Sequence, residues 1–163
     1  MSSLYRLVYA SKAKVDLGES GINLEIGRIL TKSKRNNPKV NIGGVLYYAN
    51  SHFFQVLEGD RSAVRSLYQK IIQDERHSDA QVLLEGAINQ REFNDWSMHF
   101  IPAGSDIQLL LKDHGHKAFT PFEFSSALIE EFLTVLKDNG VYQRKPFTMK
   151  GLLSGWAQIA KAR

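Results

Sequence analysis

Two strand-like runs lie almost back to back in this 163-residue chain, and they constrain its fold more than any other feature. GGVLYYA (43–49) and HFFQVLEG (52–59) are rich in aromatic and β-branched residues, and only Asn50 and Ser51 separate them. Such a short connection joins antiparallel neighbours, because parallel strands need a crossover of a dozen or more residues. The sequence therefore predicts a β-hairpin and, with it, an antiparallel-rich sheet.

Strand and helix patterns flank this hairpin. Helical spacing of apolar residues predicts a first helix over about 22–35, and a second helix follows a cap at Asp60 or Ser62. Alternating or continuous apolar residues predict three more strands, over 4–10, 80–88 and 96–101. The order is strand, helix, two strands, helix, two strands. It predicts an α+β fold, a ferredoxin-like βαββαββ sandwich with two helices on one sheet face and a C-terminal helical extension.

The C-terminal part of the chain has a different pattern. We expect a linker over 102–121, which includes the short apolar run IQLLLK, and then amphipathic helices over about 122–138 and 147–161. The predicted division is therefore a folded domain over 1–101 and a segment over 102–163 made of linker and helices. We expect these helices to pack on the far face of the sheet or between protomers.

The composition limits the classes of function. The chain has no cysteine, which excludes disulfides, thiolate catalysis and cysteine-ligated metals. No run of about 18 apolar residues predicts a membrane span, and the N-terminal sequence becomes polar too soon for a secretory signal. We therefore expect a cytoplasmic protein. The net charge of +4 has no single basic block behind it, so nucleic-acid binding receives little support.

No metal-binding or catalytic motif stands out. The histidines lack convincing metal-ligand spacing. We find no Gly-rich phosphate loop after a strand and no Ser-His-Asp constellation. We therefore expect neither a metal site nor an enzyme.

Two polar side chains fall on apolar strands. Tyr9 follows Leu7 on the first strand, and Gln55 lies between Phe53 and Leu57 on the hairpin, so both can point towards the helices. One reading is a buried hydrogen bond that stabilises the core, since buried polar groups usually satisfy one another. The other reading is a pair that also contacts a ligand.

Three other features also have a structural and a functional reading. Asn36-Asn37 precedes Pro38 and is typical of a helix end, but a carboxamide also matches the edge of a planar heterocycle. The DERH stretch (74–77) is typical of a solvated turn with a surface ion pair. Trp96 and Met98 are most simply core residues.

Five segments in order resemble the BLUF family, blue-light sensors that use FAD. They are LYRLVYAS, RNNPKVNIGGVLYY, FFQVLEGDRSAVRSLYQKI, DERH and NDWSMHF, and they span residues 4–101. The resemblance implies FAD as the cofactor, bound between the two helices of the sandwich. It also implies roles for single residues. Tyr9 is the photoactive tyrosine, Gln55 is the switching glutamine, and Asn37 is the asparagine that hydrogen-bonds the flavin, with Asn36 beside it. Ile29 and Ile71 are apolar contacts on either side of the flavin, and Asp74, Arg76 and His77 lie close to it. Trp96 and Met98 are the pair on the fifth strand that responds to the switch.

The family mechanism then supplies an expectation about signalling. Blue light excites the flavin, Tyr9 supplies an electron and a proton, and Gln55 is left rearranged with a stronger hydrogen bond to the flavin. We expect the fifth strand to transmit this structural change from Gln55 to the C-terminal helices. Because 102–163 is too short for a cyclase or phosphodiesterase, we expect a homo-oligomer that signals by light-dependent binding to an unidentified protein partner, away from membranes and nucleic acid.

Two alternatives of other classes stay open at this point. A ferredoxin-like sheet bearing Tyr47, Tyr48, Phe53 and Phe54 is superficially similar to an RNA-stacking platform, although the usual Gly-aromatic motif is missing. A BLUF-like fold without flavin, serving as an interaction domain, is the other. Tyr9, Asn37 and Gln55 argue against this second alternative.

Overall fold

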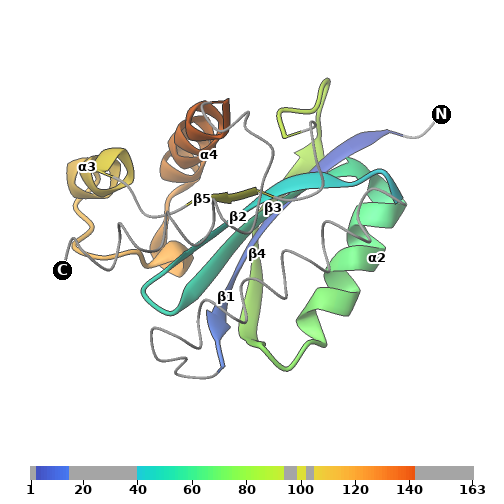
Figure 1. The fold of residues 1–163 in the computed structure, drawn as a ribbon, viewed down its shortest axis with the longest axis horizontal. Coiled ribbons are helices and arrows are strands. Elements are labelled where there is room, and N and C mark those ends of the chain that lie inside the picture. The colour runs from blue at the N-terminus through green and yellow to red at the C-terminus, as the bar shows by residue number, and fades with distance from the viewer. Residues whose placement is uncertain (1–2, 15–39, 94–98, 102–104, 142–163) are drawn as a thin grey trace, which may run out of the picture.

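A five-stranded sheet forms the centre of the fold (Figure 1). The computed structural model describes residues 3–14, 40–93, 99–101 and 105–141. The strand order is β4-β1-β3-β2-β5, and all neighbouring pairs are antiparallel except β2 and β5. The strands are β1 (Leu4–Ala13), β2 (Gly43–Ala49), β3 (His52–Asp60), β4 (His77–Ala87) and β5 (His99–Ile101).

Helices cover both faces of this sheet. The described helical elements are α2 (Arg61–Ile72), α3 (Ser105–Asp113), the 3₁₀ turn η2 (Pro121–Glu123) and α4 (Ser126–Val141). Figure 1 shows α2 on one side of the sheet and α3 and α4 on the other. The predicted ferredoxin-like α+β fold is confirmed by its likeness to solved BLUF structures. The helices predicted over 22–35 and 147–161 lie outside the described residues.

The predicted hairpin is present as β2 and β3. Its two connecting residues, Asn50 and Ser51, have positive φ angles of 49° and 58°. Left-handed backbone at both central positions matches the right-handed twist of the flanking strands, which is why two-residue hairpins favour it. The register that follows puts Leu46 opposite Gln55.

Side-chain alternation divides the core into two layers. The layer under α2 contains Tyr5, Leu7, Tyr9, Ile42, Leu46, Phe53, Leu57 and Val64. The opposite layer joins the sheet to α3 and α4, and its sheet residues are Val8, Val45, Tyr47, Phe54 and Val56. The far-face packing predicted for the first C-terminal helix is therefore correct for α4.

The second helix begins as the sequence predicts. Asp60 is its N-cap, and the Asp60 carboxylate accepts hydrogen bonds from the backbone N–H groups of Ser62 and Ala63 at 3.0 and 3.3 Å. A cap of this kind satisfies N–H groups that have no partner within the helix.

Several predicted boundaries differ from the structure. β1, predicted over 4–10, continues to Ala13. The stretch expected as a linker contains α3, because Ile107 and Leu111 lie one helical turn apart and are both buried against the far sheet face. α4, predicted over about 122–138, begins at Ser126, after the η2 turn, and ends at Val141. β4 begins at His77 rather than Ala80, because β1 supplies pairing partners as far as Ala13.

Candidate functional site

Tyr9 and Gln55 form the centre of the candidate site. They are directly opposite each other on β1 and β3, and the Tyr9 hydroxyl donates a hydrogen bond to Gln55 Oε1. Both side chains are buried in the layer that faces α2. Burial raises the pKa of Tyr9 far above its ordinary value of 10, with smaller contributions from Tyr68 and Asp74. Tyr9 therefore stays protonated and acts as a donor.

An imidazole lies beside this pair. The centroid of the His77 ring, at the start of β4, lies 6.4 Å from that of the Tyr9 ring and 4.8 Å from that of the Phe53 ring. Its Nδ1 is 2.7 Å from the buried Ser11 hydroxyl. Burial lowers the pKa of His77 to about 4, an effect that Asp74 opposes and Arg76 reinforces. His77 is therefore neutral at physiological pH.

Asp74 and Arg76 form an ion pair in the turn between α2 and β4. The Arg76 guanidinium donates to both Asp74 oxygens, at 2.8 Å through Nε and 2.6 Å through Nη2. Hydrogen bonding from Arg76 lowers the pKa of Asp74, although partial burial opposes the shift. The ion pair predicted for this turn is present. Its two side chains are only 23–24% exposed, so the pair is partly buried.

The structure brings together part of the predicted set. Ile71 on α2 packs against the layer that contains Tyr9, so it shares the site with Gln55, Asp74, Arg76 and His77. The remaining predicted residues lie outside the described residues: Ile29, Asn36, Asn37, Trp96 and Met98.

Two residues of this site were not predicted. Ser11 hydrogen-bonds to His77, and the Tyr68 ring on α2 lies 5.2 Å from the Tyr9 ring. A signal for both exists in the sequence. Ser11 is two residues from Tyr9 on the same strand, and Tyr68 is one helical turn from the buried Val64.

These residues suit a flat ligand with acceptor atoms at its edge. Gln55 presents an acceptor to Tyr9, while its amide nitrogen carries only N–H donors. Tyr68 and Ile71, from the adjoining helix, supply apolar surface. This donor set and this apolar surface fit a flavin, which combines a planar ring system with carbonyl and ring-nitrogen acceptors.

The aromatic residues of the hairpin do not form an exposed stacking platform. Tyr47, Phe53 and Phe54 are between 0 and 2% exposed, because helices cover both sheet faces. The RNA-binding alternative therefore loses its main support. Among the described residues, no cluster of three or more histidine, aspartate or glutamate side chains could hold a metal ion. Within the same residues, no helix is long and apolar enough to cross a membrane.

Comparison with protein families gives one match over most of the sandwich. The family model described as "BLUF: Sensors of blue-light using FAD" matches residues 4–99. A photoactivated adenylate cyclase subunit beta of Euglena longa is 34% identical over 98 residues, 60% of this chain. The blue light- and temperature-regulated antirepressor BluF of Escherichia coli K12 is 34% identical over 74 residues, 45% of this chain. The chain spans only 11% and 18% of these two relatives' lengths.

Solved structures match a larger share of the chain. The photo-activated state of BlsA is 32% identical, with a TM-score of 0.77, and the match covers 82% of this chain and 94% of that one. The dark state of BlrB, a BLUF protein, is 27% identical, with a TM-score of 0.66, and the match covers 85% and 96%. These matches extend beyond the sandwich, because 82% of the chain exceeds the residues that the family model spans.

Proposed function

Because this chain belongs to the BLUF family of blue-light sensors using FAD, we propose that it is a flavin-binding photoreceptor whose switch is the buried Tyr9–Gln55 pair. The observation that carries the proposal is the hydrogen bond between these two side chains, at the centre of the layer that faces α2. A stabilising pair alone would need no further partner. The family match and the donor set beside it favour a ligand-linked pair.

We assign the cofactor contacts to residues from several elements. Gln55 and Tyr9 would hold the edge of the FAD ring, and Ile71 would pack on its face. Asp74, Arg76 and His77 would lie at its periphery. By motif match alone, Asn37, Asn36 and Ile29 complete this set, and Trp96 and Met98 follow the switch.

Bound FAD supplies absorption of blue light and an excited ring that can accept an electron. Tyr9 is the electron and proton donor, and its hydrogen bond gives the Oη proton a direct route to Gln55 Oε1. Loss of both leaves Tyr9 as a neutral radical, and when the electron returns the proton must return with it, because burial disfavours a tyrosinate at this position. The Gln55 amide is the group that stays rearranged, by rotation or tautomerisation, since its two ends differ in hydrogen-bonding character.

We further propose that the chain signals without catalysing a reaction. The rearranged Gln55 would shift the conformation of the sheet and, through it, that of the C-terminal helices, and this change would alter the binding of a protein partner in the cytoplasm. The chain would act as a homo-oligomer. The antirepressor named among the relatives provides a precedent for signalling by contact, and the adenylate cyclases provide one for signalling to a catalytic domain.

Absorption spectroscopy tests the proposal. The purified protein should be yellow and should show a small, reversible red shift under blue light. Tyr9→Phe and Gln55→Leu should keep the flavin and lose the normal shift. Tyr47→Phe is the matched control, because Tyr47 is also a buried tyrosine but lies in the opposite core layer. It should keep a normal photocycle.

Two results would contradict the proposal at different levels. A colourless protein that cannot be reconstituted with FAD would favour the flavin-free interaction domain. A normal red shift in both Tyr9→Phe and Gln55→Leu would leave the photoreceptor standing and remove the switch assignment.

A further inference from the structure

A buried carboxylate lies on β3 three residues beyond Gln55. Glu58 is fully buried and points to the face opposite Gln55, because three residues along a strand reverse the side-chain direction. Arg6, its cross-strand partner on β1, donates to Glu58 Oε1 from Nε at 2.7 Å and from Nη2 at 2.6 Å. One carboxylate oxygen is thereby satisfied by a single guanidinium.

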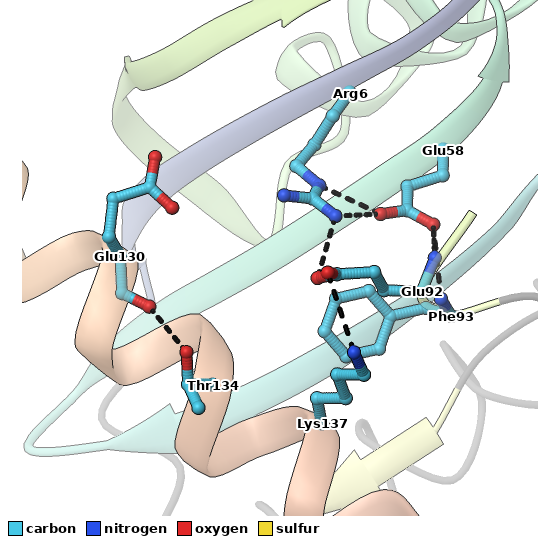
Figure 2. Close-up of polar contacts among 7 residues, drawn as sticks. All are labelled: Arg6, Glu58, Glu92, Phe93, Glu130, Thr134 and Lys137. Carbon is cyan, nitrogen blue, oxygen red and sulfur yellow. Dashed lines mark hydrogen bonds and ion pairs between the residues drawn. The ribbon is translucent and has the colours of Figure 1, made fainter. Parts of the chain in front are cut away.

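The other oxygen of Glu58 accepts hydrogen bonds from backbone N–H groups rather than from a side chain. Glu58 Oε2 accepts hydrogen bonds from the N–H groups of Glu92 and Phe93, at 2.8 and 3.0 Å (Figure 2). These residues belong to the connection between β4 and β5. A buried carboxylate strongly favours keeping such partners, since loss of either leaves an uncompensated charge or an unsatisfied donor. Glu58 therefore fixes the 92–93 backbone against β3.

The same cluster reaches α4. The Glu92 side chain accepts from Arg6 Nη2 at 2.9 Å, and Lys137 Nζ on α4 lies 3.5 Å from Glu92 Oε1. Figure 2 shows Lys137, Glu92, Arg6 and Glu58 following one another as alternating charges. The Lys137 contact is the longest of the series, and its side chains are 43% and 30% exposed. It is the link that breaks most easily.

We propose that Glu58 is a positioning residue for the light response, which couples β3 to α4 through Glu92 and Lys137. The proposal rests on the proposed function, in which Gln55 is the switch. Gln55 and Glu58 lie roughly 10 Å apart along one strand. A displacement of β3 at Gln55 therefore moves Glu58 and the backbone that Glu58 holds. The two states are α4 with its last turns held by Glu92 and α4 with those turns released.

Hydrogen–deuterium exchange on the full chain with bound FAD, in the dark and under blue light, tests this coupling. The wild type should show severalfold faster exchange in the last turns of α4 under light. Lys137→Met should show fast exchange already in the dark and lose the light-minus-dark difference. Lys137→Arg, which can restore the ion pair, should keep the difference. All three proteins should keep the flavin red shift, because Lys137 lies on the other side of the sheet from Gln55.

Two further variants separate coupling from general effects. Lys12→Met is the matched control, since Lys12 forms an exposed ion pair with Asp79 of similar length, 3.4 Å. It should keep the difference in α4. Glu58→Gln keeps the shape of the side chain but loses its charge, and we expect severalfold faster dark-state exchange at the Glu92 and Phe93 amides. Unchanged exchange at these two amides would overturn the positioning role of Glu58. If the glutamine variant does not fold, Glu58→Asp, which keeps the charge but shortens the reach to the two N–H groups, is measured in its place.

The outcomes distinguish this inference from the photoreceptor proposal. A wild type that shows the red shift but no light-dependent exchange in α4 overturns the coupling alone. An unchanged light-minus-dark difference in Lys137→Met also overturns it. A wild type that binds FAD but shows no red shift overturns both proposals.

Discussion

Acidification should weaken the fold of this chain through His77, and replacing that residue should remove the effect. His77 lies between the Phe53 ring and the Ser11 hydroxyl, and this burial lowers its pKa to about 4. In the unfolded chain the imidazole is exposed to water and titrates near its ordinary value of 6.5. The folded state therefore binds this proton less readily than the unfolded state does.

The sign and size of the effect follow from that difference. Between pH 6.5 and 4 the unfolded state carries the extra proton, so the free energy of unfolding falls as the pH falls. Each unit of pKa difference corresponds to about 1.4 kcal/mol. The largest contribution is therefore about 3 kcal/mol, and about 2 kcal/mol should be lost between pH 7 and 4.5. Asp74 acts at lower pH, because Arg76 holds its pKa below the usual value.

Urea unfolding followed by circular dichroism at pH 7 and 4.5 measures this contribution. His77→Gln should lose about 2 kcal/mol less than the wild type over this interval. His114→Gln is the control for the loss of a histidine elsewhere in the fold, because His114 pairs with Glu131 on α4 and its replacement leaves His77 and its contacts intact. It should keep the loss of about 2 kcal/mol that His77 causes. Equal losses in the wild type and His77→Gln would refute the conclusion that burial keeps this imidazole neutral.

Two further predictions concern the framework of the site. Phe132→Ala should lower the free energy of unfolding by about 3–5 kcal/mol in urea titrations, because its fully buried ring packs on Tyr47 and Phe54 and its removal leaves a cavity in this core layer. A loss below 1 kcal/mol would mean that α4 is not packed on the sheet in solution. Ser51→Gly should raise the free energy of unfolding by about 0.5–1 kcal/mol, since glycine adopts the positive φ of 58° without steric cost. Differential scanning calorimetry should show the matching rise in Tm, and a fall would contradict the turn geometry.

The sandwich was predictable because its strands are short-range patterns. Alternation placed Tyr9 and Gln55 on the same face, and the two-residue connection at Asn50-Ser51 fixed the hairpin. The hydrogen bond between Tyr9 and Gln55 follows from these two facts together with the rule that buried polar groups find partners.

Residues whose surroundings come from distant elements were not predictable in the same way. Ile107 and Leu111 make α3 amphipathic only because the far sheet face receives them, and the run alone looks like part of a linker. Glu58 appears in the sequence as an ordinary charged residue near the end of a strand. Its burial depends on Arg6 and on two backbone N–H groups more than 30 positions away. The roles of Asn37, Trp96 and Met98 stay predictions from the family motif.

The cover that α3 and α4 provide for the far sheet face has a consequence for anyone dividing the chain. Val8, Tyr47 and Phe54 share one core layer with Phe119 and Phe132. A fragment that ended at residue 101 would expose this aromatic sheet face as a large apolar patch, and such patches promote aggregation. The sandwich should therefore be transplanted into other proteins together with residues 105–141, or with a replacement helix designed to cover the same face.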